Sequence, residues 1–299
     1  MCSHLSYRNQ TEITHFILQG IGGPLSIKVP FYLLFLMLYI MTLCGNLLII
    51  GLFLQSHYLR SPMYFFLSHL SLCDILLSTS VVPKLLSALL KEGETISFRD
   101  CITQFFATSL ATAAECHLLT AIIMSTKLCV LLVSWSWFLS LLYCSIAIIE
   151  MLDLDFCGCN VLDSIYCDIA PLLKISCRNA SHLQLTCLIL ASPGILFTFL
   201  FILSTYIKIS LTILSISSST GKQKAFSTCC SHLSVVCTYF GILVAKYTVP
   251  SNGQSLIINK AISLLYTSVT PVLNPMIYSF RNKEIRAAIM KWTSMRTRS

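Results

Sequence analysis

Two carboxyl groups stand within long apolar stretches of this chain, where charged side chains are rare. Asp74 and Glu115 are both surrounded along the sequence by residues suited to hydrocarbon or a protein interior. An ionisable group in such a stretch suggests function by default, because burying it is costly. Two neighbouring carboxylates cannot both stay charged without a cation. If the fold brings these two together, they either bind a cation or hold a proton and hydrogen-bond across helices.

Other reactive side chains give weaker signals. No nucleophile, base and orienting group stand at a recognisable spacing, which argues against an enzyme. His117 suggests a metal ligand, but no second His or Cys stands at a convincing ligand spacing. We interpret His117 as a histidine of the core.

Long apolar runs must position these groups. The chain has 299 residues, of which 56% are hydrophobic and 11% charged, and its mean hydropathy is +0.79. An aqueous surface cannot be made from this composition, whereas about 20 apolar residues cross a bilayer as a helix. We therefore predict an all-α bundle of seven transmembrane helices, near residues 29–54, 63–86, 102–124, 128–149, 183–214, 228–249 and 257–280.

The placement of Lys and Arg orients this bundle, because positive residues in short loops stay cytoplasmic. One side carries eleven of the 20 Lys and Arg residues with Glu284 as its only acid, while the other side is balanced. The amino terminus is therefore predicted outside and the carboxyl terminus inside, in a multi-pass protein of the plasma membrane. The basic inner face suits anionic membrane lipid or an acidic partner.

The predicted organisation has three parts. Residues 1–28 form an extracellular tail with a glycosylation sequon at Asn9, and residues 29–280 form the transmembrane domain with a long outer loop at 150–182. Residues 281–299 form a cytoplasmic tail that begins as a short amphipathic helix on the inner membrane surface. Apart from Cys2 in the tail, five of the 15 cysteines lie on the outer side, where disulfides persist, and spacing alone does not fix their pairing.

Five segments in a fixed order carry a resemblance to a known family. They are Gly45-Asn46, Pro62 to Ser68, Leu70 to Asp74, Lys224 to Leu233, and Pro271 to Lys283. With these segments the chain resembles the odorant receptors of the rhodopsin-like G-protein-coupled family, over nearly its whole length. The resemblance implies an outer pocket for a small volatile odorant, a cytoplasmic face for a stimulatory olfactory-type G protein, and no nucleic acid partner.

The resemblance also implies particular sites. It pairs Cys101 with Cys167 and Cys157 with Cys177, leaving Cys159 as the odd thiol, and it places a conformational switch at Asn274, Pro275 and Tyr278. It joins Asp74, Glu115 and Asn274 near Asn46, which suggests a sodium ion as the cation. Its ligand-binding residues map onto Thr108, Ser109, Thr112, Phe240, Val244 and Tyr266. Each of these six could equally pack between helices, where small polar residues are common. No acid stands where an amine ligand needs its counter-ion, so a neutral or weakly polar ligand is expected.

One segment of the family is missing. In the family the third helix ends in a Met-Ala-Tyr-Asp-Arg-Tyr stretch and a loop follows, whereas here Thr120 is almost joined to Met124. The gap is about sixteen residues, more than four helical turns. The two helices can still form a hairpin around 125–127, but the arginine that supports the G protein is lost, and Lys127 cannot reproduce its planar fork. The chain is thus predicted to be an odorant receptor whose coupling is in question, the alternative being a membrane protein that binds ligand or a partner without signalling.

Overall fold

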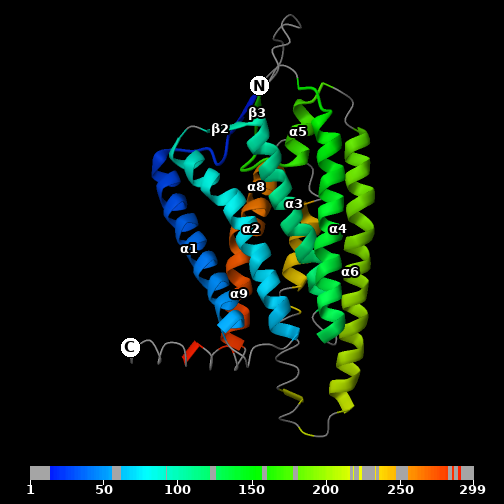
Figure 1. Ribbon diagram of the computed structural model, residues 1–299. Coiled ribbons are helices and arrows are strands. Elements are labelled where there is room, and N and C mark those ends of the chain that lie inside the picture. Colours follow the sequence, from blue (N-terminus) through cyan, green and yellow to red (C-terminus); the bar gives the residue numbers. More distant parts are fainter. Residues whose placement is uncertain are drawn as a thin grey trace, which may run out of the picture.

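A bundle of long helices makes up most of the molecule (Figure 1). The computed structural model describes residues 14–55, 62–91, 93–121, 126–156, 160–177, 181–215, 218, 222–223, 233, 236–246, 255–281, 285 and 289–290. The long helices are α1 (Leu25–Gln55), α2 (Pro62–Leu90), α3 (Phe98–Ala121), α4 (Thr126–Leu152) and α6 (Ser181–Ser215). A sixth helix is described over Val236–Lys246. The last is continuous through α8 (Ser255–Leu264), the π-helix η2 (Leu265–Val269) and α9 (Thr270–Arg281). The predicted seven-helix bundle is confirmed.

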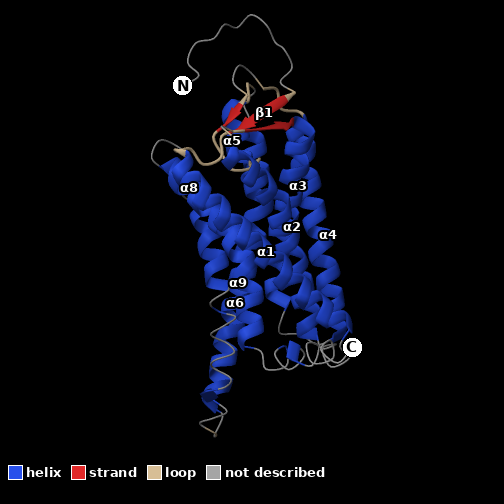
Figure 2. Ribbon diagram, turned by 90° about the vertical axis from the view of Figure 1, so that its left-hand side faces the viewer, coloured by secondary structure: helices blue, strands red, loops and turns tan. Residues whose placement is uncertain are grey.

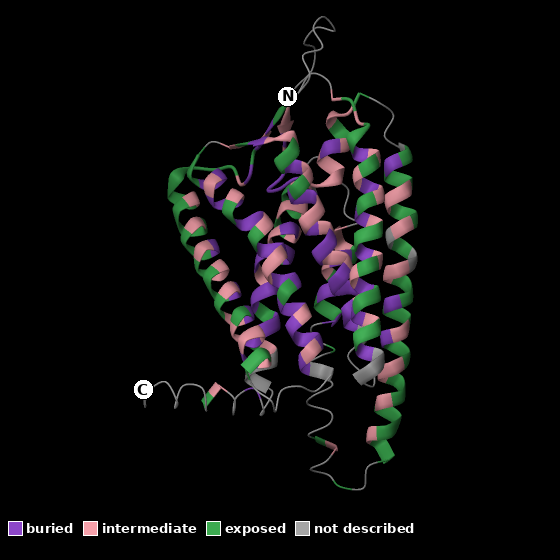
Figure 3. Ribbon diagram, viewed as in Figure 1, coloured by how far each residue is buried: buried purple, intermediate pink, exposed green. Residues whose placement is uncertain are grey.

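The outward faces of this bundle are apolar. Five helices of the described chain are long and apolar enough to cross a membrane, and α3 and the sixth helix are not among them. α3 carries Glu115, His117 and four threonines, and the described part of the sixth helix is short. Much of α1 and α6 is exposed along the length of each helix (Figure 3), and many of the exposed residues are large apolar ones, among them Phe197 at 69%. Such faces fit hydrocarbon rather than water.

A small sheet at the outer end was not predicted from the sequence. β1 (His15–Leu18) pairs antiparallel with β2 (Glu94–Ser97) and parallel with β3 (Val161–Leu162), giving the order β2-β1-β3 (Figure 2). Phe16 and Leu18 alternate with less buried neighbours, as strand residues do, and both are buried. Four residues are too few for this alternation to stand out beside long apolar runs. The outer tail is therefore fastened to the bundle from residue 14 onward.

Close packing of α1 on α9 supplies a hydrogen bond that a proline removes from the last helix. Pro275 has no N–H, so the carbonyl of Pro271, four residues earlier, lacks its helical partner. The Asn46 side chain of α1 donates to that carbonyl at 3.0 Å. Gly45 permits this approach, because a Cβ there would lie 3.1 Å from two carbons of Pro275. Within a membrane, neighbouring helices must supply such bonds.

The junction of α3 and α4 is as short as the sequence indicated. α3 ends at Ala121 and α4 begins at Thr126. The predicted turn at 125–127 is wrong in one respect, since Thr126 and Lys127 already belong to the first turn of α4. Residues 122–125, which connect the two helices, lie outside the described part of the chain.

Candidate functional site

The two intramembrane carboxyl groups meet at one amide. The Asn274 Nδ2 of α9 donates to both carboxyl oxygens of Asp74 on α2, at 3.0 and 3.1 Å, and lies 3.5 Å from Glu115 Oε1 on α3. All three side chains are buried, at 1–2% exposure. The structure thus brings together three groups from distant parts of the sequence, as the resemblance implied.

Three further oxygens near these helices are buried without a hydrogen bond in the described chain: Glu115 Oε2, Asn46 Oδ1 and Ser268 Oγ. Orphaned buried oxygens of this kind call for an explanation. Carboxylate, amide and hydroxyl oxygens are the ligands that hard cations prefer. Among the described residues, no group of three His, Cys, Asp or Glu side chains is placed to hold a metal ion by those ligands alone. The donor set fits a hard cation.

A second polar group joins three helices one level further out. Tyr266 of η2 donates its hydroxyl to Thr112 Oγ1 of α3 at 2.7 Å, and Tyr239 of the sixth helix donates to the Thr112 carbonyl at 2.8 Å. Thr112 Oγ1 in turn donates to the Thr108 carbonyl at 2.7 Å. The Phe240 ring packs edge-on against Tyr239. The structure therefore brings together four of the six residues that the resemblance implied for ligand binding. It adds Tyr239, whose only signal in the sequence is its place beside Phe240.

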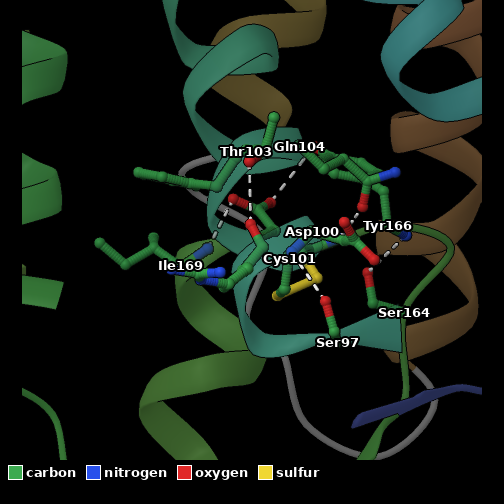
Figure 4. The surroundings of a disulfide bond; sticks show 12 residues. Ser97, Asp100, Cys101, Thr103, Gln104, Ser164, Tyr166 and Ile169 are labelled. Atoms are coloured by element: carbon green, nitrogen blue, oxygen red, sulfur yellow. Dashed lines mark hydrogen bonds between the residues drawn. A yellow bond between two sulfur atoms is a disulfide. The ribbon is translucent and has the colours of Figure 1, made fainter. Parts of the chain in front are cut away.

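The outer loop is fastened over this group by a disulfide. Cys101 of α3 is bonded to Cys167, and both are fully buried. Gln104 lies near the bond (Figure 4). Its side chain accepts from the Cys167 N–H at 2.8 Å and donates to the Ser80 carbonyl of α2 at 2.7 Å. The predicted pairing is present, and the loop is tied to two helices at one point.

Next to this disulfide, the loop also contacts the sixth helix. Lys246 Nζ lies 3.1 Å from Asp168 Oδ2 and donates to the Tyr166 hydroxyl, which in turn donates to Asp168 Oδ2 at 3.3 Å. Burial, followed by the charge of Asp168, raises the pKa of Tyr166 to about 12, so its hydroxyl keeps its proton. Asp168 Oδ1 accepts from the first N–H of α5 (Ile169–Ile175) at 2.8 Å. Lys246, Tyr166 and Asp168 were not predicted from the sequence, although Tyr166 and Asp168 flank a predicted disulfide cysteine.

Comparison with known proteins decides the family. A sequence model described as olfactory receptor matches residues 35–296, most of the chain. The chain belongs to the olfactory receptor family. It is 37% identical to olfactory receptor 5B21 of Mus musculus, over 96% of this chain and 95% of the relative. It is 40% identical to olfactory receptor 5G3 of Homo sapiens, over 95% of this chain and 96% of the relative. Squid rhodopsin has the same fold, with a TM-score of 0.57 at 15% identity over 91% of this chain and 86% of the other.

The length of these matches bears on the missing segment of this receptor. The match to the mouse relative extends over 302 positions, more than the 299 residues of the chain, yet covers only 96% of the chain. Since 96% of 299 is about 287, about fifteen positions of the relative have no counterpart here. That number agrees with the gap of about sixteen residues inferred from the sequence of α3 and α4.

Some predicted residues of this olfactory receptor do not join the group around Thr112. Val244, one turn beyond Phe240, is 54% exposed, so the structure does not place it among these buried side chains. Ser109 is half-buried. His117 lies 3.4 Å from the Ser140 hydroxyl of α4, within the bundle, as expected for a core histidine.

Several predicted sites lie wholly or partly outside the described residues. Cys177 is disulfide-bonded, but Cys157, its predicted partner, and Cys159, the predicted odd thiol, lie outside the described residues. So is the sequon at Asn9. Of the predicted switch, Asn274 is placed by the bonds above and Pro275 lies inside α9, while the Tyr278 side chain is not described.

Proposed function

We propose that this receptor detects small neutral or weakly polar volatile compounds and signals to a stimulatory olfactory-type G protein at the plasma membrane. Its family supplies odorant detection and G-protein coupling in general, and its apolar helices make it a multi-pass membrane protein. The observation that carries the ligand class is the group around Thr112, where hydroxyls and aromatic rings meet. No Asp or Glu is among the residues of this group, so an amine would find no counter-ion.

The geometry suggests how a ligand would act there. Thr112 ties α3 to the sixth helix through Tyr239 and to η2 through Tyr266. A ligand with an acceptor or donor group can take the place of one of these bonds. It favours an active arrangement only by binding that arrangement more tightly than the inactive one. A mostly apolar lining with a few directional polar groups is typical of sites that bind small molecules.

Replacing Tyr266 with Phe tests the assignment. A panel of volatile alcohols, ketones and esters is first screened for compounds that raise the unfolding midpoint of the purified receptor, a readout that does not need coupling. Tyr266→Phe removes one hydroxyl, whose bond is worth about 1 kcal/mol, so the Kd of those compounds should change about fivefold. Tyr39→Phe is the matched control, because it removes another tyrosine-to-threonine bond, at 3.3 Å to Thr79. Equal Kd values for Tyr266→Phe and wild type would place the ligand elsewhere.

We also propose that a sodium ion binds between Asp74, Glu115 and Asn274. The support is the buried carboxyl pair together with the orphaned oxygens of Glu115, Asn46 and Ser268. A bound cation would allow both carboxyl groups to remain charged in a site that excludes water. Sodium would thereby hold α2, α3 and α9 in one arrangement.

The test is the unfolding midpoint in sodium and in potassium at equal ionic strength. Sodium at ten times its Kd adds about 1.4 kcal/mol of stability to the wild-type receptor, which corresponds to a rise of a few degrees. Asp74→Asn should abolish this difference, while Glu94→Gln, which changes an outer acid paired with Lys91, should retain it. Equal midpoints for the wild type in both salts would leave the two carboxyl groups sharing protons instead.

A further inference from the structure

Lys246 is a cation at the outer end of the described part of the sixth helix, and its partners come from the outer loop and from aromatic rings. Its Nζ contacts the carboxylate of Asp168 and the hydroxyl of Tyr166 on the outer loop, and it lies over two aromatic rings. The Nζ is 5.1 Å from the centre of the Tyr166 ring and 5.8 Å from that of Tyr266. Only 20% of its side chain is exposed. An ammonium group so enclosed exerts a stronger field than one in water.

Tyr266 links this cation to the proposed ligand group. Its ring faces Lys246, and its hydroxyl donates to Thr112 Oγ1. The face of one side chain therefore borders the ammonium and its edge borders the threonine. A small ligand bound beside this ring at the group around Thr112 therefore has its outer end near Lys246.

The charges around Lys246 select among polar ends. Asp168 already balances the ammonium, so a ligand carboxylate would add an uncompensated anion, and a ligand ammonium would be repelled by Lys246. A ligand carbonyl oxygen can accept one of the three N–H donors of the ammonium in exchange for a present partner, such as the Tyr166 hydroxyl. We propose that Lys246 determines specificity in this receptor, by donating to the carbonyl oxygen of neutral ketones, aldehydes and esters. This inference rests on the proposed function, because it names the ligand class of the same site.

Four compounds with tails of similar size test it: methyl hexyl ketone, octane, octanoate and octylamine. The unfolding midpoint of the purified receptor is measured against the concentration of each. The wild type should be stabilised most by the ketone, and Lys246→Met should weaken ketone binding by about tenfold or more, since a bond to a charged donor is lost. Lys246→Arg should restore part of this affinity. Stabilisation by octane should be the same in all three.

Lys260→Met is the matched control. Lys260 is also 20% exposed, is paired with an acid of the outer loop, Asp163, and donates to the Gly20 carbonyl at 2.9 Å. It should bind the ketone as the wild type does. Because Lys246→Met leaves Asp168 without its partner, the double variant Lys246→Met/Asp168→Asn is measured beside it, as it removes both charges and keeps an oxygen to cap α5.

The outcomes separate the two proposals. Ketone affinity unchanged in Lys246→Met and in the double variant, with the wild type stabilised, would overturn the role of Lys246 and leave the ligand group around Thr112 in place. Stronger binding of octanoate or octylamine than of the ketone would also overturn it. A wild-type receptor that none of the four compounds stabilises would overturn the proposed ligand site and this inference together.

Discussion

Inserting the family's missing segment between α3 and α4 is expected to raise ligand-evoked cyclic AMP by about tenfold or more. Coupling free energies between two sites are typically about 1–3 kcal/mol, which corresponds to about 5–150-fold. The resemblance assigns to that segment the arginine that supports the bound G protein. In the structure α3 ends at Ala121 and α4 begins at Thr126, so only four residues connect the helices. Four residues span at most about 14 Å, too little to form a loop against a partner protein.

The measurement compares cells that express this chain with cells that express the extended version, together with a stimulatory G protein. Surface labelling of both separates coupling from trafficking. The control insertion has the same length but carries alanine in place of its arginine, and it should signal no better than the short chain. A full response from the short chain at equal surface level would contradict this prediction and show that the receptor couples without the arginine motif.

The helices could be predicted because each is formed by one continuous apolar stretch of the sequence. A run of about 20 apolar residues has one stable form in a bilayer, whatever its neighbours are. The outer sheet could not be predicted, because strands of two to four residues gain their stability from partners far away in the sequence, as the pairing of Ile17 with Val161 illustrates. Register of this kind depends on how the outer loop folds.

The candidate sites divide in the same way. Asp74 and Glu115 stood out because carboxyl groups in apolar runs are costly, and the resemblance then supplied Asn274. Lys246 did not stand out, since a lysine at the end of a membrane helix usually extends to water. Its role follows from a loop that brings Tyr166 and Asp168 to it. The bond from Asn46 to the Pro271 carbonyl was likewise not predicted, although the resemblance placed Asn46 near the carboxyl pair.

Breaking the Cys101–Cys167 disulfide is expected to remove nearly all receptor from the cell surface. The bond closes a loop with a sequence separation of 66 residues, worth about 4 kcal/mol in the chain-entropy account. Folded domains are stable by only about 5–15 kcal/mol, so this loss is a large share of the total. Both cysteines are also fully buried, and Gln104 bonds to the backbone of one of them. Two serines there would leave the space of the S–S bond unfilled and would bury two hydroxyl groups.

The measurement is surface labelling against total protein for Cys101→Ser, Cys167→Ser and the double variant, with Cys44→Ser as the control. Cys44 is a free, exposed cysteine of α1, and its replacement should leave surface levels unchanged. If the bond itself matters, the double variant should be no worse than either single one, because both lose the same cross-link. If a stray thiol causes retention through wrong pairing, the double variant should recover. Normal surface levels in either single variant would show that Gln104 and the Lys246 ion pair hold the outer loop without the disulfide.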